Sequence, residues 1–195
     1  MEYLPQQLMN GIALGSTYAM IALGLSLIFG VLLIPNFAHG EFYMLGAFIT
    51  YSLTVAGFNF WLAMVLAIIA VIAIGFLLER IAFKPIETAP PLSLMISALA
   101  ASIILQQIAT LIWGSEARTI PSPLVGVWRA PFFVLTYMQI TIIGVLLVAC
   151  IAIWILLHHT ALGLSIRATA QNRNAAMLMG IEMLHVRFAT FAIGA

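Results

Sequence analysis

The sequence contains no aspartate, a single lysine and a single cysteine, and charged residues make up only 7% of its 195 positions. Without aspartate, neither a Ser-His-Asp triad nor an aspartyl dyad can form. Lys84 follows Phe83 rather than glycine, so the sequence lacks the glycine-rich loop with which many ATPases bind phosphate. Cys150 has no second cysteine with which to form an intrachain disulfide. We therefore expect no catalytic residues in this chain.

Acidic and basic residues nearly balance and leave a net charge of +1. Such a balance gives no indication that the chain binds nucleic acid. His39 and Glu41 are close in the sequence, but two potential ligands are too few to predict a metal site. We expect the chain itself to bind neither a metal ion nor a cofactor.

Apolar residues are present in excess and account for 64% of the chain. A soluble domain usually has about 25% charged residues, and a soluble fold of this size cannot hide so much apolar surface in one core. About 20 helical residues span the hydrocarbon of a bilayer. Five uncharged apolar runs match or approach this length: residues 8–34, 42–56, 60–78, 92–113 and 138–157.

These runs predict an all-α, polytopic transmembrane helical bundle of five spans that forms one domain over residues 1–195. A sixth apolar run begins at Phe188 and reaches Ala195, which is too short to cross a bilayer. We interpret it as a truncated sixth span, in a chain that is a fragment of a longer protein or a truncated gene product. The first residues lack the basic stretch of a cleaved signal peptide, so we expect the first run to remain in the membrane.

Basic residues are distributed unequally among the polar segments that separate the runs. Segments 79–91 and 158–187 lie on the same side, since two spans separate them, and they hold five of the lysines and arginines. Segment 114–137 holds the other two. The positive-inside rule places the five in the cytoplasm and the N-terminus outside.

The segment between the first two runs, residues 35–41, breaks the helical pattern. The run after it covers only about 22 Å at helical rise, so the break is predicted to lie below the membrane surface, beside protein or a water-filled cavity. Broken helices of this kind line transport routes. Asn36 and Glu41 would then stabilise a helix start, and we predict Asn36, His39 and Glu41 as substrate-pathway residues. A plain interfacial turn is the alternative.

Small and polar side chains inside the runs predict contacts between helices. Gly11, Gly15 and Ala19 are spaced four residues apart and form one stripe for close helix packing, or for contact with the pathway or another subunit. Gln106 lies in the fourth run, where lipid offers no hydrogen-bond partner to its side-chain amide. We expect Gln106 to bridge helices or to line the substrate pathway.

The segment 160–187 combines basic residues with a helix-permissive middle, RATAQNRNAAMLMGIEML. Met177, Ile181 and Leu184 recur at spacings of four and three, which predicts a short amphipathic helix along the cytoplasmic face of the membrane. Such a helix is either an interfacial connection or a docking element for a cytoplasmic partner.

Several stretches also resemble one family of membrane proteins. In chain order they are NGIALGSTYAMIALGLSLIFGV, NFAHGEFYMLGAF, ERIAFKPI, SALAASIILQQIATLIWGSEAR and TALGLSIRATAQNRNAAMLMGI. Together they resemble the LivH-like permease subunits of branched-chain amino-acid ABC transporters, over nearly the whole chain.

The resemblance implies a multi-pass ABC importer permease in the bacterial inner membrane that moves branched-chain or related amino acids and is not an enzyme. Its implied partners are a second permease subunit, cytoplasmic ABC ATPases that bind the ATP, a periplasmic substrate-binding protein and membrane lipid. Ala175, Ala176 and Gly180 resemble the core of the loop that seats such permeases on their ATPases, and with Arg173 they form the implied coupling site in segment 160–187. Asn174 stands where many ABC importers carry glutamate.

Other functions remain open at this stage. A permease for urea or short amides shares the same sequence pattern. A stand-alone channel or carrier, or a membrane scaffold, would have no need of a coupling segment.

Overall fold

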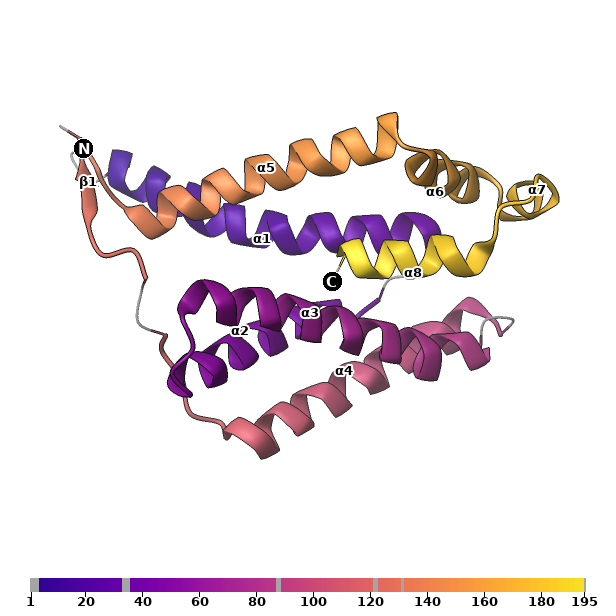
Figure 1. Ribbon diagram of the computed structural model, residues 1–195, viewed down its shortest axis with the longest axis horizontal. Helices are drawn as coiled ribbons and strands as arrows, with labels where there is room; N and C mark the ends of the chain where they lie inside the picture. Colours follow the sequence, from indigo (N-terminus) through magenta and orange to yellow (C-terminus); the bar gives the residue numbers. More distant parts are fainter. Residues whose placement is uncertain (1–3, 33–35, 87–88, 121–122, 131, 195) are drawn as a thin grey trace.

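The structure, a computed structural model, describes residues 4–32, 36–86, 89–120, 123–130 and 132–194. These residues are mostly helical (Figure 1). In chain order the elements are α1 (Leu4–Leu32), α2 (His39–Val55), α3 (Phe60–Leu78), a π-helical turn η1 (Glu79–Phe83), a 3-10 turn η2 (Lys84–Ile86), α4 (Pro91–Trp113), β1 (Val127–Arg129), β2 (Val134–Thr136), α5 (Tyr137–His159), α6 (Ala161–Gln171), α7 (Arg173–Leu178) and α8 (Met183–Gly194).

The long helices form two layers (Figure 1). One layer consists of α1, α5 and α8, and α6 extends it at one end; the other consists of α2, α3 and α4. The layers meet where α8 contacts α3 and where α2 contacts α1. The start of α1 and the hairpin lie at one end of the bundle, and α6 and α7 lie at the opposite end.

Polar side chains fix the first residue of several helices. Asn59 accepts a hydrogen bond from a backbone N–H in the first turn of α3, and Thr136 and Gln139 form a capping box at the start of α5. Thr160 and Asn172 accept backbone hydrogen bonds at the starts of α6 and α7. Each satisfies an N–H group that the first helical turn leaves without an intrahelical partner.

In the part of the chain that the structure describes, four helices are long and apolar enough to cross a membrane: Leu4–Gly30, Phe60–Ile86, Pro91–Trp113 and Tyr137–His159. They correspond to the first, third, fourth and fifth predicted runs and support a helical membrane bundle. α2 has 17 residues and α8 has 12, so both are shorter than these four helices. The count of five spans with a truncated sixth therefore stays a prediction.

Two polar segments are more ordered than their sequences indicated. The helix of the third run continues beyond Leu78 through η1 and η2 to Ile86, because a switch to wider and then tighter turns accommodates Pro85 near its end. The segment 114–137 contains an antiparallel hairpin in which Trp128 pairs with Leu135. This hairpin was not predicted, and its strands have only three residues each.

Among the described residues, buried apolar side chains form two clusters between the long helices and a smaller one in which Ile166 of α6 meets Val186 of α8. The first joins α1, η1, α4 and α8 and consists of Ile28, Phe83, Leu94, Ala98 and Phe191. The second joins α2, α3 and α4 and consists of Phe42, Leu45, Val71 and Ala109. α5 has no buried residue, and many of its apolar side chains, such as Leu147, Val148 and Ile151, are exposed, as they would be in contact with lipid.

Candidate functional site

The start of α2 lies deep inside the bundle rather than at its end. The Nε2 atom of His39 is 3.1 Å from the carbonyl oxygen of Ile21, which is about three helical turns before the last residue of α1. Asn36, Ala38 and His39 are all at least 95% buried. The start of α2 therefore lies against protein inside the bundle, and its depth below the membrane surface stays a prediction.

Asn36 stabilises this break from within. Its Oδ1 atom accepts a hydrogen bond from the Ala38 N–H at 3.1 Å, and its carbonyl oxygen accepts one from the His39 N–H. Asn36 is thus part of the turn that begins α2 and is 2% exposed. Its observed role is to hold this turn, and a role in the pathway stays a prediction.

Glu41 lies in the first turn of α2 and connects that helix to α4. Its Oε1 atom accepts hydrogen bonds from the Ser102 hydroxyl at 2.8 Å and from the Gln106 side-chain amide at 2.7 Å. Gln106 also donates to Ser102. The structure therefore gives Gln106 the helix-bridging role that its depth in the membrane predicted.

The predicted pathway residues form two groups on different sides of α2 rather than one site. Glu41 and Gln106 bond to each other between α2 and α4. His39 contacts α1 instead, and its ring lies edge-on to Phe42 at a centroid distance of 5.8 Å. Residues two apart on a helix point about 200° apart, so His39 and Glu41 face different neighbours.

The glycine stripe of α1 does not mediate packing among the described residues. Gly11 and Gly15 are exposed, and a Cβ atom added to either would meet no atom within 4 Å. Ala19, in the same stripe, is half-exposed. The buried face of α1 runs through other residues of the described chain, so the predicted role of this stripe in helix packing or in contact with another subunit stays a prediction.

The close helix crossing occurs farther along α1, at Gly24. A Cβ atom added there would collide with the Gly194 carbonyl oxygen of α8 and would lie 2.8 Å from His39 Nε2. Glycine is therefore required at this position for α1, α2 and α8 to meet. The sequence spacing alone did not distinguish this glycine from the others.

The predicted coupling segment folds into two helices and a turn. A Cβ atom at Gly163 would collide with backbone atoms of Leu156 and Leu157, so this glycine allows α6 to fold back against the end of α5. α7 follows after Asn172 and ends at a turn in which Gly180 has a φ of +85°. That left-handed conformation favours glycine.

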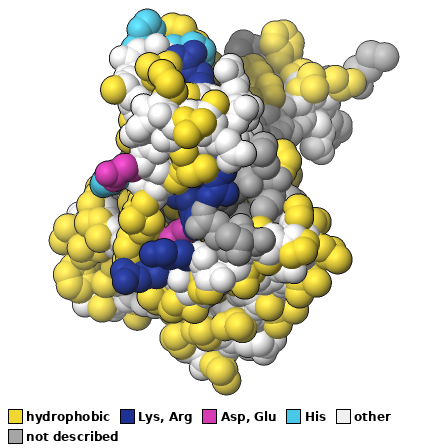
Figure 2. Space-filling model, turned by 90° about the vertical axis from the view of Figure 1, so that its right-hand side faces the viewer, with side chains coloured by type: hydrophobic (Ala, Val, Ile, Leu, Met, Phe, Trp, Pro, Cys, Tyr) yellow, Lys and Arg dark blue, Asp and Glu magenta, His cyan; other side chains and the backbone are white. Residues whose placement is uncertain are grey.

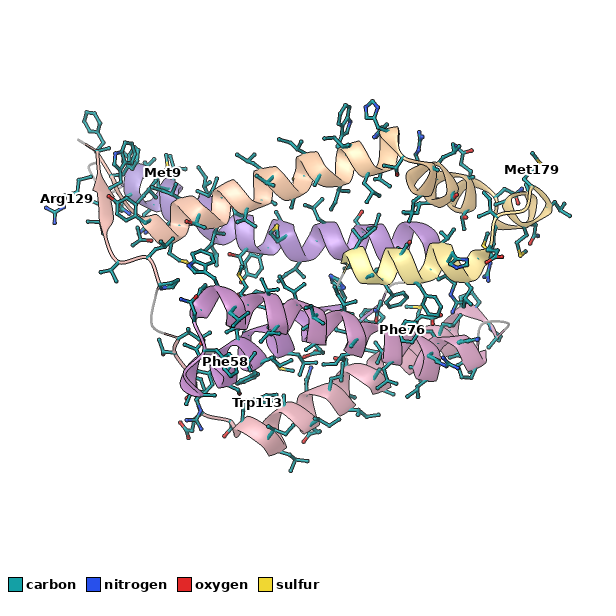
Figure 3. All side chains as sticks on the ribbon, in the orientation of Figure 1. Met9, Phe58, Phe76, Trp113, Arg129 and Met179 are labelled. Carbon is teal, nitrogen blue, oxygen red and sulfur yellow. The ribbon has the colours of Figure 1, made fainter. Side chains whose placement is uncertain are left out.

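The expectation of one amphipathic helix through Met177, Ile181 and Leu184 is wrong. The turn at Gly180 separates α7 from α8, so the spacing of four and three does not place these residues on one helical face. Ala176 is 3% exposed, whereas Leu178 is 88% and Met179 is 83% exposed. Figure 3 shows Met179 at the tip of this end, away from the bundle.

The sequence reasoning missed a buried ion pair behind this segment. Glu79 of η1 is fully buried, and its Oε1 atom accepts a hydrogen bond from the Arg187 guanidinium of α8. Figure 2 shows lysine and arginine side chains gathered beside an acidic side chain at this end of the molecule. The sequence does contain an indication of this ion pair, because Glu79 directly follows one apolar run and Arg187 directly precedes another.

The ion pair also joins the two polar segments that the topology prediction assigns to the same side. Glu79 belongs to segment 79–91 and Arg187 to segment 158–187, so their contact confirms that both segments lie at the same end. Partial burial and the positive charge of Arg187 lower the pKa of Arg173, the first residue of α7. The start of α7 is thus close to the buried pair.

The fold and these sites define a class of protein, a polytopic helical membrane protein whose helix break lies inside the bundle. Among the described residues, no group of three or more histidine, cysteine, aspartate or glutamate side chains could hold a metal ion.

The chain belongs to the family described as the permease component of the branched-chain amino acid transport system, whose family model matches residues 7–195. It is therefore a transport component rather than an enzyme. It is 36% identical to the high-affinity branched-chain amino acid transport system permease protein LivH of Escherichia coli K12, over 99% of this chain and 67% of that protein. It is 35% identical to the corresponding permease BraD of Pseudomonas aeruginosa, over 97% of this chain and 66% of BraD.

A more distant relative, the probable permease LivH of Methanocaldococcus jannaschii, is 26% identical over 89% of this chain. No solved structure matches the chain.

Proposed function

We propose that this chain is the permease subunit of an ABC importer that carries branched-chain amino acids across the bacterial inner membrane. Its partners are a second permease subunit, cytoplasmic ATPases that bind and hydrolyse the ATP, and a periplasmic protein that delivers the substrate. α1 to α5 serve as five spans, with α2 as the short one. The family and the printed names of LivH and BraD support this assignment.

The observation that carries the proposal is the exposed apolar tip formed by Leu178 and Met179. Both side chains are more than four-fifths exposed at the end of the bundle where basic side chains gather (Figure 2), which the positive-inside rule assigns to the cytoplasm. Apolar side chains at such a polar end contribute little to folding and are suited to a partner surface. The ATPase is the partner that an importer requires there.

Contacts behind the tip connect it to the membrane helices. α7 follows α6 after the single residue Asn172 and contacts it, and Ile166 of α6 packs against Val186 of α8. Arg187, the next residue of α8, bonds to Glu79 at the end of α3. Displacement of α7 by an ATPase would therefore move α8 and the end of α3 together, because packed helices move as rigid bodies.

The docking test is the double variant Leu178→Asp with Met179→Asp, made in the assembled transporter. We expect at least about a tenfold loss of ATPase co-purification, because burial of two apolar side chains would be replaced by burial of two charges. Membrane insertion should be unchanged. Val125→Asp is the matched control, since Val125 is 90% exposed at the opposite end. Unchanged co-purification of the double variant would contradict docking at this tip.

The substrate test is uptake of radiolabelled leucine and of radiolabelled urea by the same complex. Leucine uptake that depends on ATP and on the delivery protein is the expected result. Uptake of urea without leucine would assign the chain to the amide permeases instead. Uptake without any ATPase would indicate a stand-alone channel or carrier.

A further inference from the structure

α4 is the outermost helix of its layer, and the described chain leaves most of its surface uncovered. Its contacts are mainly with α2 and η1, and Figure 1 shows α2 and α3 between it and the layer of α1. The buried residues of α4 form one stripe, which consists of Leu94, Ala98, Ala101, Ser102 and Ala109. The rest of the helix faces whatever surrounds this chain in the membrane.

The uncovered face of α4 differs in polarity from the uncovered faces of α3 and α5. α3 and residues 142–157 of α5 contain no charged, amide or hydroxyl side chain, so their outer faces are suited to lipid. α4 instead exposes the side-chain amides of Gln106 and Gln107. Polar side chains in membrane helices face protein or a water-filled cavity rather than lipid. The α4 face is therefore not an ordinary lipid-facing surface.

The polar side chains lie well inside the span of α4. Ser102 is the central residue of the helix Pro91–Trp113 and is about 16 Å from either end at helical rise. Gln106 follows one turn later, and together they hold the Glu41 carboxylate at this level. α4 is long and apolar enough to cross a membrane, so the carboxylate lies within the ~30 Å of hydrocarbon.

Two polar groups on this face lack a hydrogen-bond partner. Ser102 and Gln106 both donate to Oε1 of Glu41, whereas Oε2 has no partner among the described residues and Glu41 is only partly buried. The Gln107 amide has no partner in the described part of the chain either. Because a carboxylate at this depth is costly against lipid, the face requires a protein that brings hydrogen-bond donors into the membrane.

Of the partners in the proposed importer, the second permease subunit alone reaches this level. The ATPases bind at the cytoplasmic end and the delivery protein at the external end, whereas a second permease subunit places its own helices in the bilayer. We propose that α4, with the first turn of α2, is the surface against which the second permease subunit packs, and that a donor of that subunit bonds to Glu41 Oε2. This inference rests on the proposed function for the partner and adds the face that it covers.

The interface is tested by photo-crosslinking in the purified, assembled transporter in lipid nanodiscs. The photoreactive residue p-benzoylphenylalanine replaces Gln107, and we expect a covalent adduct that peptide mass spectrometry identifies as this chain joined to a permease subunit. The same residue at Ile69, which is 58% exposed in the middle of α3, is the control and should give no such adduct. Adducts to lipid or to the same chain at position 107 would overturn the interface. Subunit adducts from Leu14, beside the glycine stripe of α1, with none from position 107 would also overturn it.

The role of the carboxylate is tested by comparing Glu41→Leu with Gln106→Leu. Both variants remove the hydrogen bond between α2 and α4, but only the first removes the carboxylate. We expect the dissociation constant of the two permease subunits in detergent to rise at least about tenfold more for Glu41→Leu, because a hydrogen bond to a charged group would be lost between subunits. Equal rises would show that the carboxylate acts only within this chain.

A third variant does not depend on the bonds within the chain. Gln107→Trp adds a bulky ring to an exposed position, so it should leave the melting temperature of the isolated chain unchanged but weaken subunit association about tenfold or more, since overpacking displaces the partner helix. Ile69→Trp on α3 should leave association unchanged. Unchanged association with Gln107→Trp would overturn the interface.

Leucine uptake separates this inference from the proposed function. Subunit adducts at position 107 in a complex that does not take up leucine would support the interface and contradict the import function. Normal leucine uptake by a transporter in which Gln107→Trp leaves subunit association unchanged would overturn the interface and leave the import function standing.

Discussion

At the scale of single residues, Glu79 and Arg187 form an ion pair of two buried, oppositely charged side chains. Glu79 is 0% and Arg187 is 6% exposed, and both lie where apolar helices meet the polar end of the bundle. Moving a charge into such surroundings costs several kcal/mol, and the cost is offset only when an opposite charge is correctly placed. The pair is therefore sensitive to the loss of either partner.

Replacement of Glu79 by glutamine should destabilise the protein by about 3 to 5 kcal/mol, because Arg187 would remain buried without a countercharge. Thermal unfolding in detergent, followed by size-exclusion chromatography of a fluorescent fusion, measures the change. Glu116→Gln is the control, since Glu116 is an exposed loop glutamate, and it should stay within about 0.5 kcal/mol. Equal melting temperatures for both variants would contradict a structural role for the pair.

At the scale of elements, α2 depends on its neighbours more than the longer helices do. It has 17 residues, begins inside the bundle at the turn of Asn36, and is connected to α4 through Glu41, Ser102 and Gln106. Near the last turns of both helices, Trp113 Nε1 donates to the Ser52 hydroxyl at 2.6 Å. Polar contacts near both ends of α2 thus join it to the second half of α4, with apolar packing between them.

Adjacent glutamines on α4 allow a matched test of this joint. Gln106→Leu should destabilise the bundle by about 1.5 to 3 kcal/mol, because it removes a hydrogen bond to the Glu41 carboxylate. Gln106 and Gln107 are both exposed, but Gln107 has no hydrogen-bond partner among the described residues, so Gln107→Leu should leave the melting temperature unchanged or raise it. Similar losses for the two variants would indicate that the bond to Glu41 contributes little.

At the scale of the whole molecule, the two ends of the bundle differ in charge and in structure. Figure 3 shows Arg129 on the hairpin at one end and Met179 beyond α7 at the other. Gln6 connects the start of α1 to Val134 of the hairpin, so the N-terminal helix start and the hairpin share a side. The unequal distribution of lysine and arginine then predicts which side is cytoplasmic.

Cysteines at the two ends test this orientation in intact cells. In a Cys150→Ser background, Arg129→Cys should react with a membrane-impermeant maleimide added outside, because the hairpin end faces outward. Arg167→Cys on α6 should react only after the cells are opened. The reverse pattern of labelling would invert the topology and would remove the basis for docking of ATPases at α7.

The helical membrane class and the same-end relation of two polar segments were predicted from the sequence alone. Both depend on local properties of the sequence, since a single long uncharged run can form all of its backbone hydrogen bonds in lipid only as a helix. The break before α2 could also be predicted, because residues 42–56 are too few for an ordinary span. The family was indicated by contiguous stretches, and the family match agrees with that resemblance.

Only the tertiary structure decided which small and polar residues meet. The sequence analysis selected Gly11, Gly15 and Ala19 on α1, yet the close contact with α8 and His39 occurs at Gly24, which it did not select. It likewise placed His39 and Glu41 together, although the α-helical rotation between them turns one toward α1 and the other toward α4. These contacts depend on how helices that are distant in sequence cross each other. Helical periodicity predicts the face of the helix on which a residue lies, but it does not predict which helix packs against that face.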